Sequence, residues 1–473
     1  MRKRVLLMNP PSGLYRRDDR CQSKVEDQTV RVIFPPVELA VLASIARDQH
    51  ADVLLRDYPT IRASRADYLR DLEQFHPDLI VFPSTVHTIQ DDMEAVRLAR
   101  EVTPDVRVLT KGESVAYLAE HIFRDYPELD FIADGEPEMT FLDVLRDRQP
   151  DTIPGLIWRD SSGKVIRNAP RPLLEPLDAL PLPAYDLIDM TLYRSPENNR
   201  PIAAIYAQRG CPARCVFCPA GSMYEFRVRE RSVEHVMKEI RLCVRDYGIR
   251  DFLFHGDTFT LHKRWLIDLC KAIVEEKLDI HWGCNSRVDT IDDERAEWLK
   301  RAGCWVVAFG FEHGSQEMLD KMKKGARVEK AFEAVRICRR HGLKVHGFFV
   351  IGLPWETRET LEECYRFARA LSPDFFDFNI AYPLPGTEFF EIARRDNLFE
   401  LENPAVGGYA RAAVRTYELT SEELTEWRRR ALLKMYARPG YVFRMLRHAA
   451  VSGNLTHYVR AAGLRLTNLI TGK

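Results

Sequence analysis

The sequence predicts an α/β protein with two parallel-sheet domains in series and a helical C-terminal region. Short apolar segments alternate with stretches of helical period up to about residue 400, which is the pattern of βαβ units. Small and polar residues follow most of these apolar segments, as expected where parallel strands end at a functional edge. At 473 residues the chain has room for about three domains.

Residues 1–148 are predicted to form a doubly wound, Rossmann-like parallel sheet. Strands are expected at 5–8, 53–55, 79–82, 106–109 and 131–133, and helices at 37–49, 65–75 and 89–102. Ligands of such sheets bind at the carboxyl ends of the strands, where Ser84, Thr85, Gly112, Gly135 and Glu136 occur. The loops lack a Gly-x-Gly-x-x-Gly fingerprint, which argues against a nicotinamide dinucleotide. A flavin, or no ligand at all, remains open from these residues.

Residues 149–198 are rich in proline and are predicted to form a packed linker with a small hairpin around 160–163. Residues 199–400 then repeat a strand and a helix about six times. Strands are expected at 202–207, 252–254, 280–285, 305–309, 345–351 and 375–381, with helices at 232–247, 263–276, 292–302, 328–341 and 357–371. This series predicts a partial (β/α)6 barrel of the TIM type, whose reactive groups gather at the C-terminal ends of the strands.

Three cysteines follow the first barrel strand at the spacing Cys-x-x-x-Cys-x-x-Cys: Cys211, Cys215 and Cys218. Thiolates on one short loop select zinc, copper(I) or an iron–sulfur cluster. Structural zinc wants four ligands, and no second pair at finger spacing follows nearby. A [4Fe–4S] cluster normally takes four cysteines, so three suggest an open iron. A zinc knuckle, a disulfide pair or core cysteines remain the alternatives.

This spacing, with the aromatic Phe217 before the last cysteine, resembles the radical S-adenosylmethionine (radical SAM) superfamily. The resemblance implies that Cys211, Cys215 and Cys218 hold a [4Fe–4S] cluster whose open iron chelates SAM. A reductant such as flavodoxin or ferredoxin would then drive cleavage of SAM to a 5′-deoxyadenosyl radical, which abstracts hydrogen from a substrate. The resemblance extends through the barrel, and it implies SAM-binding roles for Phe217, Gly256, Asp257, Asn285, Arg287, Glu312 and Gly352. His255 departs from the acidic residue that is frequent at its position.

The first domain resembles the cobalamin-binding domain that precedes many radical SAM domains. The similar features are Asn-Pro-Pro after the first strand, Ser-Thr after the third and Gly-Glu-x-Glu after the fifth. They imply that cobalamin is bound by Asn9, Pro10, Ser84, Thr85, Gly112, Gly135 and Glu136. The Asp-x-His-x-x-Gly motif of many such domains is not matched at His50. We therefore expect His50 to be a surface histidine, His87 to be a polar loop residue, and the lower face of cobalt not to be held by histidine.

Composition and charge are those of a soluble globular protein, with 45% hydrophobic and 29% charged residues. The net charge of −1 gives no global field for nucleic acid. The cysteines outside the central three are scattered through apolar patterns, the N-terminus is too short for a signal peptide, and no apolar run reaches the length of a membrane span. A cytoplasmic enzyme is therefore expected.

The C-terminal region, residues 401–473, is predicted to be helical and basic, because no Asp or Glu occurs from Trp427 to Lys473. Such a segment is typical of a helix on a membrane surface, of a helix packed over the barrel with a solvated basic face, or of a site for an anionic partner. The first of these interpretations makes peripheral membrane association possible for a cytoplasmic enzyme.

The family resemblance leads to a functional hypothesis. The protein is expected to abstract hydrogen from an unactivated carbon of a small-molecule or lipid substrate and to methylate it with methylcobalamin. The first alternative is cobalamin-dependent radical cyclisation or rearrangement of a lipid or tetrapyrrole without methyl transfer. The second is a non-catalytic sensor that binds cobalamin and a cluster.

Overall fold

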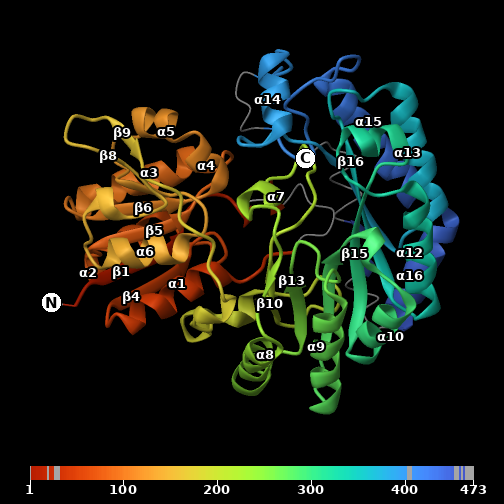
Figure 1. Ribbon diagram of the computed structural model, residues 1–473, viewed down its shortest axis with the longest axis horizontal. Helices are drawn as coiled ribbons and strands as arrows, with labels where there is room; N and C mark the ends of the chain where they lie inside the picture. The colour runs from red at the N-terminus through yellow and green to blue at the C-terminus, as the bar shows by residue number, and fades with distance from the viewer. Residues whose placement is uncertain are drawn as a thin grey trace. The chain divides into compact units, whose positions relative to one another are not determined.

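A computed structural model describes residues 2–18, 21–25, 32–401, 407–451, 458–459 and 462–463. The chain forms two compact units (Figure 1). The first consists mainly of Ile33–Leu192 with the N-terminal strands, and the second mainly of Tyr193–Pro383 with the C-terminal helices.

The first unit is a seven-stranded sheet in the order β4-β1-β5-β6-β7-β8-β9. The five predicted parallel strands are confirmed as β1 (Arg4–Asn9), β4 (Asp52–Asp57), β5 (Leu79–Pro83), β6 (Arg107–Lys111) and β7 (Phe131–Ala133). The hairpin expected in the linker adds β8 (Leu156–Arg159) and β9 (Val165–Arg167) to this sheet as antiparallel strands. The helices are α1 (Val37–Asp48), α2 (Arg65–Phe75), α3 (Ile89–Val102), α4 (Glu113–Tyr117), α5 (Ala119–Asp125) and α6 (Pro137–Leu145).

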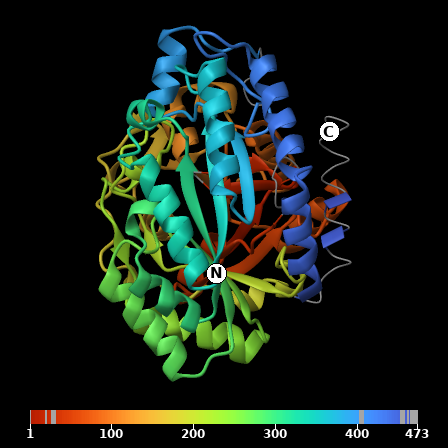
Figure 2. The same cartoon turned by 90° about the vertical axis from the view of Figure 1, so that its right-hand side faces the viewer.

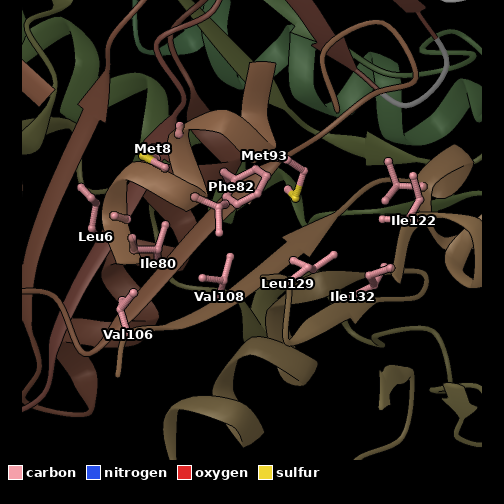
Figure 3. Close-up of a cluster of buried hydrophobic side chains, with 14 of the residues drawn as sticks. Leu6, Met8, Ile80, Phe82, Met93, Val106, Val108, Ile122, Leu129 and Ile132 are labelled. Carbon is pink, nitrogen blue, oxygen red and sulfur yellow. The ribbon is translucent and has the colours of Figure 1, made fainter. Parts of the chain in front are cut away.

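The core of the first unit explains its doubly wound form. Residues 5–8 of β1 and all of β5 are buried on both faces of the sheet, so neighbouring side chains point alternately into two apolar layers. Figure 3 shows one of these layers, with Leu6, Ile80 and Val108 of three adjacent strands side by side. Met93 of α3 packs against the same cluster.

The structure adds elements to the first unit that the sequence pattern did not predict, namely the helices α4, α5 and α6 and a hairpin of two strands. Strands β2 (Tyr15–Asp18) and β3 (Cys21–Lys24) form an antiparallel hairpin after β1. Its residues are largely polar, so no apolar alternation marked them as strands.

The second unit is a six-stranded parallel sheet in the order β10-β13-β14-β15-β16-β17, which confirms the partial barrel (Figure 1). Its strands are β10 (Ile202–Tyr206), β13 (Asp251–His255), β14 (His281–Ser286), β15 (Cys304–Glu312), β16 (Lys344–Ile351) and β17 (Phe375–Ile380). The predicted helices are confirmed as α8 (Val233–Tyr247), α9 (Lys263–Glu275), α10 (Asp293–Arg301), α12 (Val328–Arg340) and α13 (Arg358–Leu371). Strands β10 and β17 are the two edges of this sheet.

The C-terminal region contains α15 (Ser421–Tyr436) and α16 (Pro439–Val451), drawn in blue in Figure 2. Thr420 starts α15 with a capping box to Glu423. Helix α15 packs on the edge strand β17, where Arg428 Nε donates to the carbonyl of Phe378 at 2.6 Å. No helix in the described part of the chain combines the length and apolar character needed to cross a bilayer.

Candidate functional site

The cysteine loop (residues 210–219) leaves a short hairpin of β11 (Gln208–Arg209) and β12 (Arg229–Glu230). Gly210 starts the loop with a φ of 98°, and a Cβ at this position would lie 1.9 Å from the carbonyl oxygen of Arg227. Only glycine fits this close approach. The Gly210 amide donates to Asp257 Oδ2 at 2.9 Å, which ties the loop to the residues that follow β13.

The three thiols of the loop are half-buried, whereas the other six cysteines with described side chains are buried. Cys211 Sγ lies 3.6 Å from Thr258 Oγ1, so Cys211 is placed at the end of β13. Among the residues with described positions, no three His, Cys, Asp or Glu side chains could hold one metal ion. A [4Fe–4S] cluster takes each thiolate on a different iron, so it does not require such a convergence. The donor set, three accessible soft ligands on one loop, fits a cluster with one open iron.

Two cations face the cysteine loop: Arg287 follows β14, and Lys324 lies on the loop after α11 (Gln316–Lys321). Lys324 Nζ lies 2.6 Å from Glu312 Oε1, and Arg287 makes a bidentate pair with Asp289 at 2.8 and 3.0 Å. Arg287 also donates to the carbonyl of Lys324 at 3.1 Å, which joins the two pairs. Burial raises the pKa of the Cys215 thiol, and the positive charges of Lys324 and Arg287 oppose that rise. Both cations are paired with carboxylates, and their charges still favour the thiolate form of Cys215.

Glu312 ends β15 in the left-handed region, with a φ of 60°. The pairing of β15 with β16 shifts by one residue between Gly310 and Glu312, which turns the carboxylate toward Lys324. A Cβ on Gly310 would lie 2.3 Å from Glu312 Oε1 and 2.9 Å from Lys324 Nζ. The glycine thus provides the space that the buried pair occupies.

A second buried network supports the turn at Gly352, after β16. The Gly352 amide donates to Glu356 Oε2 at 3.1 Å, and His313 Nε2 lies 3.2 Å from Glu356 Oε1. His313 Nδ1 accepts the amide of Ser315 at 3.0 Å, so Nε2 carries the proton and donates to the carboxylate. The sequence analysis did not select His313 or Glu356, because neither their burial nor their pairing across 43 residues is visible in the sequence.

The remaining predicted barrel residues lie near these groups or at strand ends. The ring of His255 stacks on Tyr206 at 4.4 Å, and Gly256 packs against the side chain of Gln208. The carbonyl of Asn285 accepts the amide of Phe259 at 3.1 Å. Phe217 packs against an apolar cluster that includes its neighbour Val216.

In the first unit, Ser84 and Thr85 are buried and their hydroxyls bond within the protein. Ser84 Oγ donates to Asp92 Oδ2 at 2.7 Å, and Thr85 Oγ1 lies 3.1 Å from Thr88 Oγ1. Asp92 also receives two bonds from Arg17, at 2.9 and 2.7 Å, in an ion pair that solvent hardly reaches. Arg17 and Asp92 therefore hold the β2–β3 hairpin on the loop after β5, and sequence reasoning missed both.

The other predicted residues of this unit occupy the same edge of the sheet. A Cβ on Gly112 would lie 2.3 Å from the carbonyl oxygen of Ser84. Asn9 Nδ2 donates to Asp57 Oδ1 at 3.0 Å, and the next residue, Pro10, is buried. Gly135 is exposed, with no atom within 4 Å of a Cβ position, and Glu136 Oε2 accepts the amide of Leu174 at 2.8 Å.

The two histidines considered for this unit lie apart from one another. His50 is exposed in the turn before β4, at the amino ends of the strands. His87 is half-buried after β5, and its amide donates to Thr85 Oγ1 at 3.2 Å.

Comparisons with known proteins agree with this geometry. Residues 205–368 match the radical SAM superfamily. An uncharacterized methyltransferase from Pyrococcus horikoshii is 33% identical over 440 residues, which cover 92% of this chain and 93% of the relative. The anaerobic magnesium-protoporphyrin IX monomethyl ester cyclase of Rubrivivax gelatinosus is 26% identical over 383 residues, which cover 78% of this chain and 68% of that enzyme.

A solved structure shares the fold. It is that of the radical S-adenosylmethionine methyltransferase TsrM from Kitasatospora setae, with cobalamin and a [4Fe–4S] cluster bound. The TM-score is 0.66 at 21% identity, and the overlap covers 84% of this chain and 75% of that one. The family match and the near full-length similarity to the Pyrococcus relative show that this chain is an enzyme of the radical SAM superfamily.

Proposed function

We propose that the protein is a cobalamin-dependent radical SAM methyltransferase that acts on an unactivated carbon of a small organic substrate. The observation that carries the proposal is the loop of three half-buried thiols beside Asp257, Arg287 and Lys324 in the partial barrel. The cluster with SAM would supply hydrogen-abstracting radical chemistry there, and cobalamin would supply the methyl group. A small-molecule reductant or a protein such as flavodoxin or ferredoxin would provide the electron.

The side chains of the barrel then have distinct roles. Cys211, Cys215 and Cys218 hold the cluster, and Asp257 fixes the start of their loop through the Gly210 amide. The proposed SAM-binding groups Arg287 and Glu312 are held in place by Asp289 and Lys324, respectively. The proposed SAM-binding set is completed by Asp257, Asn285, Phe217, Gly256 and Gly352.

We infer that the first unit binds cobalamin at the carboxyl ends of β1, β5, β6 and β7. The overlap with the cobalamin-bound methyltransferase covers more of the chain than residues 193–473 contain, so it includes part of this unit. At Gly135 and Gly112 the edge of the sheet presents backbone atoms and no side chain. Gly135 is exposed, and Gly112 packs closely on Ser84. His50 lies at the amino ends of the strands, so we propose that it does not bind cobalt from below.

The substrate class is a finer proposal. Two observations favour methyl transfer. The Pyrococcus relative, which is similar along nearly the whole chain, is named a methyltransferase, and the solved structure with the same fold is that of a methyltransferase. A tetrapyrrole substrate is suggested by the similarity to the magnesium-protoporphyrin ester cyclase, and a lipid substrate by the basic, amphipathic C-terminal region. Peripheral membrane contact through the C-terminal helices would suit such a substrate.

The test is anaerobic purification, reconstitution with iron and sulfide, and incubation with SAM, dithionite and hydroxocobalamin. We expect bound iron, bound cobalamin, 5′-deoxyadenosine and S-adenosylhomocysteine. A triple Cys211→Ala, Cys215→Ala, Cys218→Ala variant should bind no iron and form neither 5′-deoxyadenosine nor S-adenosylhomocysteine. The control Cys243→Ala, at a buried position of α8, should bind iron and form both products. Absence of 5′-deoxyadenosine from the wild type would refute the proposal. Turnover without retained cobalamin would refute the assignment of the first unit.

A further inference from the structure

Helix α16 carries an apolar face that the described residues of its unit leave exposed. Val442, Phe443 and Leu446 are 43%, 69% and 49% exposed. Arg447 and Ala450 are exposed as well, and the spacing places all five on one side of the helix. Single exposed apolar residues are ordinary, but a continuous exposed stripe indicates an interaction surface.

The opposite side of α16 is fixed to the barrel. The ring of Tyr441 packs on Phe376 of β17 at 5.3 Å, and Arg444 donates to Ser372 Oγ at 2.9 Å. His448 Nε2 lies 2.9 Å from Glu197 Oε1, in the segment before β10. The inner face of the helix therefore packs against the barrel, and the exposed apolar residues lie on the opposite face.

The side of α16 that faces α13 is positively charged. Arg438 donates to the carbonyl of Arg369 at 3.2 Å, so cations from α13 and from the start of α16 lie together. The pKa of Arg438 is lowered by burial and by the nearby charges of Arg444 and Arg369. No Asp or Glu occurs in the sequence from Trp427 onward, and the nearby Glu197 is already bonded to His448 and Tyr458.

We propose that this face of α16 docks the protein on an anionic lipid membrane. Val442, Phe443 and Leu446 would enter the boundary between headgroups and acyl chains, and Arg447 on the same side would meet lipid phosphates. A second copy of the chain is less suited, because a two-fold contact would bring Arg447 and its equivalent together without a carboxylate between them. The inference is independent of the proposed catalytic function, since α16 contributes no residue to the candidate site.

The experiment is co-sedimentation of the full-length, anaerobically prepared protein with phosphatidylcholine vesicles, with and without phosphatidylglycerol. We expect binding to the anionic vesicles. Binding should be weaker at high salt, because salt screens the attraction between the arginine side chain and the lipid phosphates. Phe443→Ser, Leu446→Ser and Arg447→Glu should each lower the partition coefficient, roughly tenfold for the apolar changes. Matched controls are Ile61→Ser, at 46% exposure, and Arg264→Glu on α9, neither of which should change binding.

Three outcomes would overturn the proposal. They are no binding to anionic vesicles, equal binding of the α16 variants and the wild type, and a wild-type dimer in light scattering that Leu446→Ser converts to a monomer. Thermal unfolding of each variant checks that the fold is retained. Sedimentation requires no turnover, so its failure is distinguishable from failure of the methyl-transfer proposal.

Discussion

Lys324 and Glu312 form a buried ion pair, with Nζ 2.6 Å from Oε1 and both side chains less than a tenth exposed. Burial alone would lower the pKa of Lys324, but the charges of Glu312 and Cys215 raise it above its usual value. The lysine therefore stays protonated beside the cysteine loop. Because the pair is shielded from solvent, each partner depends on the other.

Replacing one partner of this pair should be more harmful than replacing both. Lys324→Met leaves Glu312 buried without a counter-charge, which we expect to cost about 3–5 kcal/mol of unfolding free energy. The double variant Lys324→Met/Glu312→Leu should recover much of that loss. Urea unfolding of the apo protein measures it, with Lys323→Met, at an exposed pair with Glu388, as the control. Equal destabilisation by the single and double variants would contradict the coupling.

Gly310→Ala should break the same pair without removing a charge. The added Cβ would lie within 3 Å of both charged atoms, so one of them must move. We expect weaker SAM binding and less 5′-deoxyadenosine per enzyme, because Glu312 is displaced. Gly440→Ala, where no atom lies within 4 Å of the added carbon, is the matched control. Unchanged SAM affinity in Gly310→Ala would show that Glu312 does not contribute to SAM binding.

Arg17→Met should loosen the loop after β5 in the first unit. The change leaves Asp92 buried beside Ser84 and Thr88 without its bidentate partner, at a cost of about 3–5 kcal/mol. We expect a lower melting temperature and weaker cobalamin binding, followed by visible absorption of the bound cofactor. Arg16→Met on the same strand, whose guanidinium lies over the Phe34 ring, should have little effect on either measurement.

Glu356→Gln should weaken the turn at Gly352. The neutral side chain keeps the shape but loses the charge that strengthens the bonds from Gly352 and His313, which we expect to cost about 1.5–3 kcal/mol. If Gly352 lies against SAM, the distorted turn of Glu356→Gln should raise the dissociation constant of SAM. Glu359→Gln in the first turn of α13 is the control, and equal SAM affinity in both variants would refute the link.

The Arg287–Asp289 pair predicts a pH dependence of stability. Burial alone would raise the pKa of Asp289, but the hydrogen bond and charge of Arg287 hold it below its usual value. The contribution is therefore present above the unfolded pKa of about 3.9 and is lost as the pH falls through the lower folded value. Asp289→Asn should be less stable than the wild type at neutral pH, and the difference should vanish in acid. A constant difference at all pH values would contradict this assignment.

The sequence alone predicted the parallel strands of both sheets well, because they are short apolar runs separated by helices of clear period. It also selected the cysteine loop, Asp257, Arg287 and Glu312, which stand at strand ends where side chains of neighbouring units converge. The partners of these residues were not predictable. Lys324 follows Glu312 by twelve residues on a separate loop, and only the fold brings the two together.

The same limit applies in the first unit. Ser84 and Thr85 were selected for a ligand, yet their hydroxyls bond to Asp92 and Thr88 inside the protein. The partner of Asp92 is Arg17, 75 residues away on a hairpin whose polar sequence gives no strand signal. The basic C-terminal segment shows a third case, since the sequence could not tell which face of α16 is buried.

The contact of α15 with β17 has a consequence for solubility. A partial barrel has two unpaired edges, and a bare parallel edge is a template for pairing with another chain. Arg428 bonds to the carbonyl of Phe378, and the Ile380 amide donates to the carbonyl of Tyr409 at 3.0 Å, so the edge at β17 is already occupied. The C-terminal helices thus prevent edge-to-edge aggregation. A chain that lacks them should precipitate even if its barrel still folds.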